Sequence, residues 1–239
     1  MENVYTKELL IPASAADHTA RLGHYNTFAL FMDVASEHAE MLGIGYRAMI
    51  AKDLFWLTVR TKIRFFERPH ITDPVLVRTW PEKPGKIRSI RSYELWQDGR
   101  LLIAGKTEWA VLNVQKQSIV PMAGIFPEGF DFREGTALDA PFIRVGDDFD
   151  GQEVYSEYAI RSTDIDIGGH MNNVAYVRAA VGGFSLTERD ALDFAEMDVM
   201  FKRPCFEGEK LSLQKRNAEE GLDIRISKGG ETVFLARFI

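Results

Sequence analysis

The chain has 239 residues, of which 46% are hydrophobic and 27% are charged, and its formal net charge is −6. This composition is that of a globular protein with an ample core, and the negative charge argues against non-specific nucleic-acid binding, which needs a cationic surface. The single cysteine, Cys205, excludes an internal disulfide framework and a cysteine-rich zinc site. The first residues lack the layout of a secretory signal, and no apolar run approaches the roughly 20 residues that span a bilayer. We therefore expect a cytoplasmic protein with neither nucleic acid nor membrane as its partner.

The first half of the chain predicts a strand followed by a long helix. Residues 4–11 alternate as strand residues do, and a loop of small and polar residues follows. From Thr27 onward, apolar residues fall on one helical face until Gly43 closes the helix. The residues of this face are Phe28, Phe31, Ala35, His38, Ala39 and Leu42. A short second helix is expected over residues 45–52.

Four antiparallel strands are predicted after these helices. The first covers residues 55–65, where period-2 alternation predicts that five apolar residues share one face: Phe55, Leu57, Val59, Ile63 and Phe65. The others lie near 75–80, 87–96 and 101–113, with a hairpin turn at Gln97-Asp98-Gly99-Arg100. The long helix has an apolar stripe, so it must bury that stripe against this sheet.

The second half repeats this order with a shorter helix. Residues 121–150 hold several prolines and glycines and an acidic run, which is typical of a connector. A strand is expected over 194–203, and further strands near 210–217, 222–228 and 231–239. We therefore expect an N-terminal unit over residues 1–125, a connector over 126–150 and a C-terminal unit over 151–239.

The stretch with the most chemistry is 164–176, which reads Asp-Ile-Asp-Ile-Gly-Gly-His-Met-Asn-Asn-Val-Ala-Tyr. Two carboxylates and a histidine precede a predicted helix, for which Asn172 or Asn173 is a fitting N-cap. The start of such a helix presents free N–H groups and about half a positive charge beside His170. That suits a carbonyl oxygen that becomes negative. The alternative is a turn whose Asp and Asn residues only cap the helix.

A degenerate copy of this stretch lies in the first half. Asp17 precedes Gly23-His24-Tyr25-Asn26, as Asp164 precedes Gly169-His170-Met171-Asn172. Farther on, Phe66-Glu67-Arg68-Pro69 resembles Phe201-Lys202-Arg203-Pro204. Landmarks in the same order indicate a duplicated unit. In this pairing His24 takes the place of His170 without the two aspartates before it, and we interpret it as the remnant of a lost site. His38, on the apolar helix face, is expected to be a hydrogen-bonded core residue.

With these residues in view, the chain resembles the acyl-ACP thioesterases of bacterial and plant fatty-acid synthesis. The resemblance lies in Ala16-Asp17-His18-Thr19-Ala20-Arg21-Leu22, Trp56-Leu57-Thr58-Val59-Arg60, Arg78-Thr79-Trp80-Pro81, and Asp164-Ile165-Asp166 with His170-Met171-Asn172-Asn173 and Tyr176. It implies a tandem hotdog, an α+β fold of two units in which a curved antiparallel sheet wraps round a long central helix. It also implies hydrolysis of a fatty acyl-ACP thioester to free fatty acid and ACP, with Asp166 and His170 in the catalytic Asp and His places.

Two positions depart from the family pattern. The family usually has Asn two residues after the catalytic Asp, where this chain has Gly168, and plant members carry a glutamate where this chain has Pro204. Cys205, the next residue, matches a cysteine of plant members. Because Gly168 lacks an amide that would orient water or substrate, catalysis is expected to be weaker, rearranged or absent.

For thioester hydrolysis, the N–H groups that start the helix, around Asn172 and Asn173, would hold the oxyanion, and Gly168 would line the site. His170 would act as general base on water or orient it. Asp166 would fix the histidine tautomer or take the proton itself. The sequence leaves these assignments open.

Cys205 has three interpretations: a small buried hydrophobe, a residue that lines the site, or a nucleophile activated by His170. The resemblance places the acyl chain in the first unit, where Phe28, Phe31 and Met32 are candidates to shape a tunnel. Plain core packing explains the same three residues.

A concentration of positive charge at Lys83, Lys86, Arg88 and Arg91 would suit docking of the strongly acidic ACP, although a solvated strand edge explains it equally well. The five histidines lack metal-ligand spacing and no phosphate-binding loop is present, so we expect neither a metal nor an organic cofactor.

Acyl-ACP hydrolysis is therefore the expected activity. The alternatives are an acyl-CoA thioesterase and a non-enzymatic acyl-thioester-binding protein, which Gly168 and Pro204 motivate. Hotdog units normally pair, so the expected assembly is a monomer of two units or a homodimer.

Overall fold

The computed structural model describes residues 3–239 and divides into two compact units, the first ending at Ala140 and the second running from Pro141 to Ile239. The boundary lies inside the stretch predicted to be a connector, and residues 121–152 contain turns but neither helix nor strand. None of the helices among residues 3–239 is long and apolar enough to cross a membrane.

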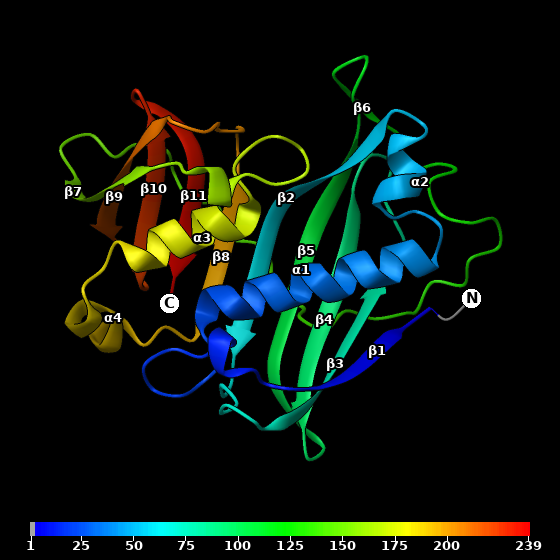
Figure 1. Ribbon diagram of the computed structural model, residues 1–239, viewed down its shortest axis with the longest axis horizontal. Helices are drawn as coiled ribbons and strands as arrows, with labels where there is room; N and C mark the ends of the chain where they lie inside the picture. The colour runs from blue at the N-terminus through cyan, green and yellow to red at the C-terminus, as the bar shows by residue number, and fades with distance from the viewer. Residues whose placement is uncertain (1–2) are drawn as a thin grey trace. The chain divides into compact units, whose positions relative to one another are not determined.

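The first unit consists of one antiparallel sheet and two helices, as the alternation and the apolar stripe predict. Its elements are β1 (Tyr5–Leu10), a 3-10 turn (Ala13–Ala15), α1 (His24–Met41), α2 (Tyr46–Ile50), β2 (Leu54–Phe65), β3 (Pro74–Pro81), β4 (Ser89–Gln97), β5 (Arg100–Asn113) and β6 (Ser118–Val120). The strand order is β1-β3-β4-β5-β2, with β6 paired to β5. The helix α1 begins at His24, three residues before the predicted start, and crosses in front of β5 and β4 (Figure 1).

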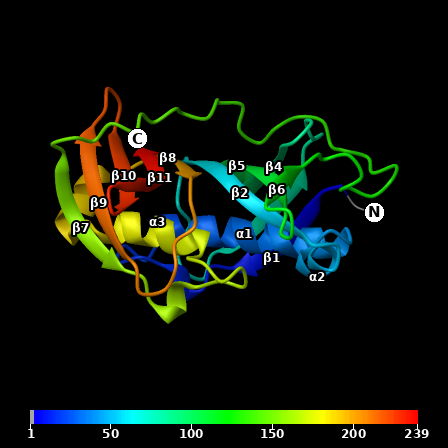
Figure 2. The same ribbon diagram turned by 90° about the horizontal axis from the view of Figure 1, so that it is seen from above.

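The helix α1 lies along one face of this sheet (Figure 2), and its apolar stripe is buried. Phe28, Phe31 and Ala35 are almost fully buried, and the Phe31 ring stacks on that of Tyr93 with centroids 4.8 Å apart. Gly105 lies beneath the helix, because a Cβ atom there would come within 3.0 Å of the Phe31 ring. Each fully buried phenylalanine stabilises the fold by about 1.5–3 kcal/mol.

The predicted face of β2 is wrong in one respect. Thr58 pairs with Trp109 and Arg60 pairs with Glu108, so Val59 is an extra residue that forms a β-bulge. A single inserted residue reverses the side-chain alternation beyond it. Phe55 and Leu57 therefore point away from the side that carries Ile63 and Phe65, which is the side facing α1.

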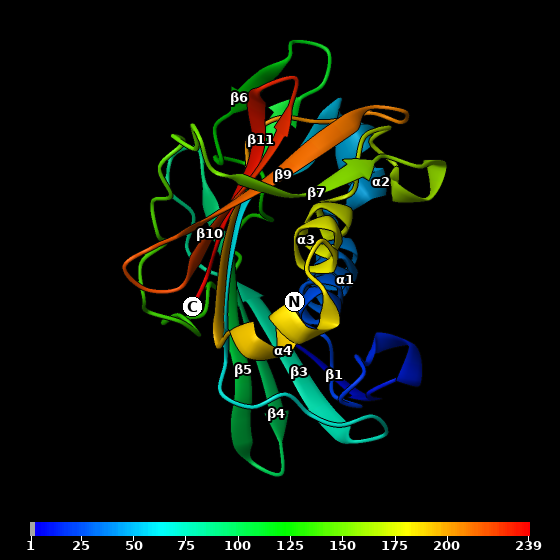
Figure 3. The same cartoon turned by 90° about the vertical axis from the view of Figure 1, so that its left-hand side faces the viewer.

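The second unit repeats the plan with a shorter helix. Its elements are β7 (Glu153–Ala159), a 3-10 turn (Ser162–Asp164), α3 (Asn173–Gly182), α4 (Leu186–Leu192), β8 (Glu196–Phe201), β9 (Lys210–Asn217), β10 (Leu222–Lys228) and β11 (Glu231–Phe238), and the strand order is β8-β11-β10-β9-β7. Within this unit α3 lies on one side of the strands (Figure 3), where Tyr176 stacks on Phe234 with centroids 5.8 Å apart. The helix α4 was not predicted; it begins with a capping box between Ser185 and Glu188.

Candidate active site

The candidate site lies on the loop that leads into α3. Ile165 and Met171 form an isolated antiparallel bridge, and the Asp166 N–H donates to the His170 carbonyl at 3.0 Å. The turn between them is closed by Gly169, whose φ of 75° falls in the left-handed region that glycine adopts without strain. The loop thus holds Asp166 and His170, four residues apart in sequence, at opposite ends of one tight turn.

The structure brings these two predicted side chains together over Gly168. A Cβ atom on residue 168 would lie 2.9 Å from His170 Nε2 and 3.0 Å from Asp166 Oδ1, so both groups lie against Gly168 and leave no room for a side chain there. The two side chains are partly exposed, at 26% for His170 and 21% for Asp166, and His170 Nδ1 is 3.7 Å from Asp166 Oδ1, beyond hydrogen-bond length. Asp166 Oδ1 accepts the Gly168 N–H at 2.8 Å.

The start of α3 offers one free donor to this region. Asn172 is the N-cap, and its side-chain oxygen accepts the Val174 N–H at 2.7 Å. The N–H groups of Ala175 and Tyr176 bond to the Asn172 carbonyl. Within residues 3–239, the Asn173 N–H is the one backbone donor of the first turn that has no acceptor. Of the N–H groups predicted to hold the oxyanion, the Asn173 N–H is therefore the one that is free to do so.

The other aspartate of the stretch, Asp164, has a structural environment. It is 2% exposed, accepts hydrogen bonds from the Tyr158 hydroxyl at 2.9 Å and the Arg161 N–H at 2.8 Å, and forms an ion pair with Arg178. These partners join β7, the 3-10 turn and α3. Asp164 therefore holds the frame in which the loop sits.

Cys205 is fully buried and anchors the loop through its backbone, because its carbonyl accepts the Met171 N–H at 2.7 Å. Burial raises the pKa of the Cys205 thiol, which favours the neutral thiol over the thiolate that a nucleophile requires. Of its three interpretations, these observations favour the buried hydrophobe.

The first unit holds the same loop, but not with the residue pairing that the sequence predicts. Asp17 N–H donates to the Arg21 carbonyl at 2.9 Å and Ala20 N–H to the Asp17 carbonyl at 3.0 Å, as Asp166 and Gly169 do in the second unit. Asp17 is therefore the counterpart of Asp166, and Arg21 that of His170. The predicted match of His24 with His170 is wrong. His24 is the first residue of α1, and it is buried with its ring edge-on to Phe65 at 4.7 Å.

The carboxylate of Asp17 is fully engaged by its neighbours. It accepts the Thr19 N–H at 2.9 Å and the Thr19 hydroxyl at 2.5 Å, and it forms an ion pair with Arg68. Burial acts to raise the pKa of Asp17, but the hydrogen bonds from Thr19 and Arg68 outweigh it and lower the pKa to about 2. In the second unit the corresponding carboxylate, Asp166, lies beside an imidazole and, among residues 3–239, has no such clamp.

Family models match both units of the chain. The family model for the acyl-ACP thioesterase N-terminal domain matches residues 2–127, and that for the C-terminal domain matches residues 148–236. The chain belongs to the acyl-ACP thioesterase family.

Similar proteins of this family come from plants and bacteria. The chain is 29% identical to a chloroplastic palmitoyl-acyl carrier protein thioesterase of Arabidopsis thaliana over 202 residues, which is 78% of this chain and 47% of that protein. It is 23% identical to the chloroplastic acyl-[acyl-carrier-protein] hydrolase FATB3 of Cuphea viscosissima, over 74% of this chain and 46% of the relative. The matched region thus spans about half the length of these curated relatives.

Solved structures show the same fold. An acyl-ACP thioesterase from Bacteroides thetaiotaomicron superposes with a TM-score of 0.85 at 18% identity, covering 99% of this chain and 97% of the other. The 12:0-ACP thioesterase of Umbellularia californica gives a TM-score of 0.82 at 16% identity, with 100% and 97% covered. The fold is the tandem hotdog.

The predicted acyl-chain residues of this thioesterase family member lie in the core of the first unit. Phe28 and Phe31 are fully buried and Met32 is half-buried. Their placement fits core packing, and their part in a tunnel stays a prediction.

One cation of the predicted basic surface is not on the surface. Arg91 is 6% exposed, and its guanidinium bonds to His38 Nδ1 at 3.1 Å; burial lowers the pKa of Arg91 to about 10. Arg91 pairs with Thr107 and Thr107 with Thr61, so all three share the side of the sheet that faces α1. The strand alternation that buries Tyr93 and Leu95 also predicts a buried side chain at residue 91. The neighbouring charged residues in the sequence suggested a surface position instead.

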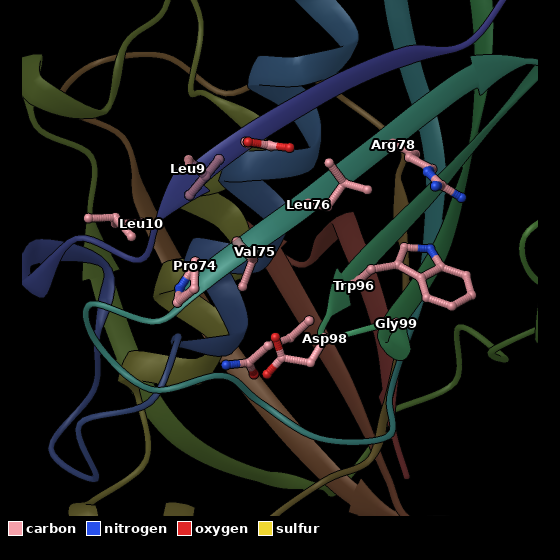
Figure 4. Close-up of a pocket in the computed structure, with 11 residues that line it drawn as sticks. Leu9, Leu10, Pro74, Val75, Leu76, Arg78, Trp96, Asp98 and Gly99 are labelled. Carbon is pink, nitrogen blue, oxygen red and sulfur yellow. The ribbon is translucent and has the colours of Figure 1, made fainter.

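An open groove of about 530 Å³ lies on β1, β3 and β4 of the first unit (Figure 4). Leu9, Leu76 and Val75 contribute to its wall, with Arg78 near the Trp96 ring, 5.6 Å from its centroid. None of the predicted site residues lines it. Across residues 3–239 no group of three His, Cys, Asp or Glu side chains is placed to hold a metal ion.

Proposed function

We propose that this protein is an acyl-ACP thioesterase that hydrolyses a fatty acyl-ACP thioester to free fatty acid and ACP. The observation that carries the proposal is the pair Asp166 and His170, which lie together over Gly168, partly exposed, just before α3 in a chain of this family. The same loop in the first unit has its acid clamped and an arginine in the histidine position.

The geometry favours His170 as the general base. Its Nδ1 atom is 3.4 Å from the Met171 carbonyl oxygen, an acceptor, so we place the proton of the neutral imidazole on Nδ1, where the negative charge of Asp166 at 3.7 Å also favours it. Nε2 then carries the lone pair, and because the His170 side chain is 26% exposed, a water molecule can reach it. Asp166 orients the imidazole and stabilises its protonated form, as an acid partner does in other base-assisted hydrolases.

The proposed reaction needs no cofactor. A water oxygen attacks the thioester carbonyl carbon while His170 takes a water proton, and the carbonyl oxygen becomes an oxyanion near the Asn173 N–H. The C–S bond then breaks and the thiol leaves with the proton from His170. A single well-placed oxyanion donor is worth about 10² to 10³ in rate, and general-base catalysis about 10² to 10⁴.

Charge supports an acidic carrier protein as the partner, docked on the first unit. Residues 141–239 hold 12 Lys and Arg against 18 Asp and Glu, whereas residues 1–140 hold 17 of each, so the net negative charge lies in the second unit. Lys83 and Lys86 are exposed on the loop between β3 and β4, and Arg88 is 3.8 Å from Glu108. We propose that Lys83, Lys86 and Arg88, without the buried Arg91, steer the carrier.

A charge reversal tests this docking surface. Lys86→Glu should raise KM for acyl-ACP several-fold at low salt and leave KM for an acyl-pantetheine thioester unchanged. Lys210→Glu, at an exposed position of β9, makes the same change in net charge and should leave both values alone. Equal responses of the two variants would remove this surface from the proposal.

The activity itself is tested by thiol release from acyl-ACP and acyl-CoA substrates of matched chain length. Faster release from acyl-ACP supports the proposed carrier, and faster release from acyl-CoA supports the alternative thioesterase. Tight binding of both without release would show a non-enzymatic acyl-thioester-binding protein and refute the hydrolase.

A further inference from the structure

Backbone hydrogen bonds after β2 and after β8 align the two units residue by residue. After β2, the N–H groups of Phe66 and Glu67 both donate to the Leu102 carbonyl, at 2.9 and 3.1 Å. After β8, the N–H groups of Lys202 and Arg203 both donate to the Val233 carbonyl, at 2.9 and 3.3 Å. Phe66 is therefore the counterpart of Lys202, one residue away from the match with Phe201 that the sequence suggests.

The next contacts continue this alignment. The Pro69 carbonyl accepts the Leu22 N–H at 2.8 Å in the first unit, as the Cys205 carbonyl accepts the Met171 N–H at 2.7 Å in the second. Pro69 and Cys205 are both buried. The residues just before them, Arg68 and Pro204, thus occupy equivalent places beside equivalent loops.

Arg68 shows what a side chain at this place reaches. Its guanidinium binds the Asp17 carboxylate and donates to the Leu22 carbonyl at 3.1 Å, and its side chain is only 12% exposed. One side chain thereby fixes both the carboxylate and the backbone just before α1.

In the second unit this clamp is absent. Pro204 is exposed, and its ring carries no polar group. Gly168 is the counterpart of Thr19, whose hydroxyl binds Asp17 in the first unit, and glycine has no side chain. Among residues 3–239, the Gly168 N–H is the one hydrogen-bond donor assigned to the Asp166 side chain. The two side chains that bind the first carboxylate, those of Thr19 and Arg68, have no polar counterpart at Gly168 and Pro204.

We infer that residue 204 is a positioning residue, from which a side chain can reach Asp166, and that proline there keeps the carboxylate unclamped beside His170. The inference concerns the chain's own geometry; only its consequence for turnover rests on the proposed hydrolase activity. A cation at position 204 would reproduce the Asp17–Arg68 pair and draw Asp166 away from His170. Asp166 could then no longer stabilise the protonated imidazole.

The test compares Pro204→Arg with Pro204→Met, which has a long side chain without charge. The Asp166 carboxyl is titrated by carbon NMR in aspartate-labelled protein, its signal assigned by loss in Asp166→Asn. In Pro204→Arg the midpoint should fall towards that of Asp17, and acyl-ACP turnover should drop about 10²-fold. In Pro204→Met both should stay near the wild-type values. Arg68→Met supplies the reciprocal result, an upward shift of the Asp17 midpoint.

The outcomes separate the inference from the proposed function. An unchanged Asp166 midpoint in folded Pro204→Arg would overturn the inference, whatever the activity. Equal losses in the Arg and Met variants would overturn it too, since they would trace the effect to the missing proline. A lowered midpoint in a protein that releases no thiol would support the inference while refuting the hydrolase.

Discussion

Replacing Gly168 by alanine probes the space that Asp166 and His170 share. The added Cβ would lie 2.9 Å from His170 Nε2, and ordinary contact begins at 3.4 Å, so the imidazole must retreat by about half an ångström. A 1 Å misplacement of a catalytic group costs about 10²-fold in rate, so we expect kcat for acyl-ACP to fall about tenfold.

The backbone should tolerate this substitution. Thr19 takes the equivalent place in the first unit with the same loop hydrogen bonds, so alanine at residue 168 should leave the melting temperature within a few degrees of wild type. KM should change little, because the predicted acyl-chain residues and the proposed docking surface both lie in the first unit. Ile167→Ala is the matched control, since its side chain is 70% exposed on the same loop.

The assay is thiol release under saturating acyl-ACP, with circular dichroism to confirm folding. Wild-type kcat in folded Gly168→Ala would refute the claim that His170 works from the position in which it lies. An equal loss in Ile167→Ala would show that the loop as a whole, and not this contact, sets the rate.

Three further predictions follow from the contacts of the two loops. Arg68→Met should lower the free energy of unfolding by about 1 kcal/mol at pH 7, because the Asp17–Arg68 pair is partly screened by solvent. The folded pKa of Asp17 is about 2 against an ordinary 3.8, so the stability difference between wild type and Arg68→Met should shrink as the pH falls from 4 to 2. Urea titrations at several pH values measure this difference. Asp164→Asn should cost about 1–2 kcal/mol of stability in the same titrations while the folded fraction keeps its kcat, because it removes the negative charge that the half-exposed Arg178 binds; a large loss of kcat would place Asp164 in the chemistry. Cys205→Ala should keep most of the turnover and wild-type enzyme should survive a thiol-blocking reagent; inactivation in both experiments would restore the nucleophile.

Much of the fold was predictable because its signals are local. Alternation and the Asp98-Gly99 turn placed β4 and β5 within two residues of their ends, and the stripe through Phe28 and Phe31 predicted which face of α1 is buried. The bulge at Val59 was not predictable from alternation, because it is defined by pairing with β5. The helix α4 lacks an apolar stripe, and its signal was the capping pair of Ser185 with Glu188.

The candidate site was predictable in part. The sequence supplied Asp166 and His170, and the structure places them beside each other, because a tight turn with five residues between the bridge partners Ile165 and Met171 leaves little freedom. The equivalence of the two units was predicted with the wrong residues, since matching histidine letters led to His24. The right pairing had a signal in the sequence. Asp17 precedes Leu22 by the same number of residues as Asp166 precedes Met171, and in both cases an acid is followed by a buried apolar residue.

Single-turnover thiol release from acyl-ACP by wild type, His170→Ala and Asp166→Asn tests the central claim most directly. The account predicts that His170→Ala slows release by about 10² to 10⁴ and Asp166→Asn by a similar factor, with substrate affinity retained in both. Release by either variant within a few-fold of the wild-type rate would contradict it.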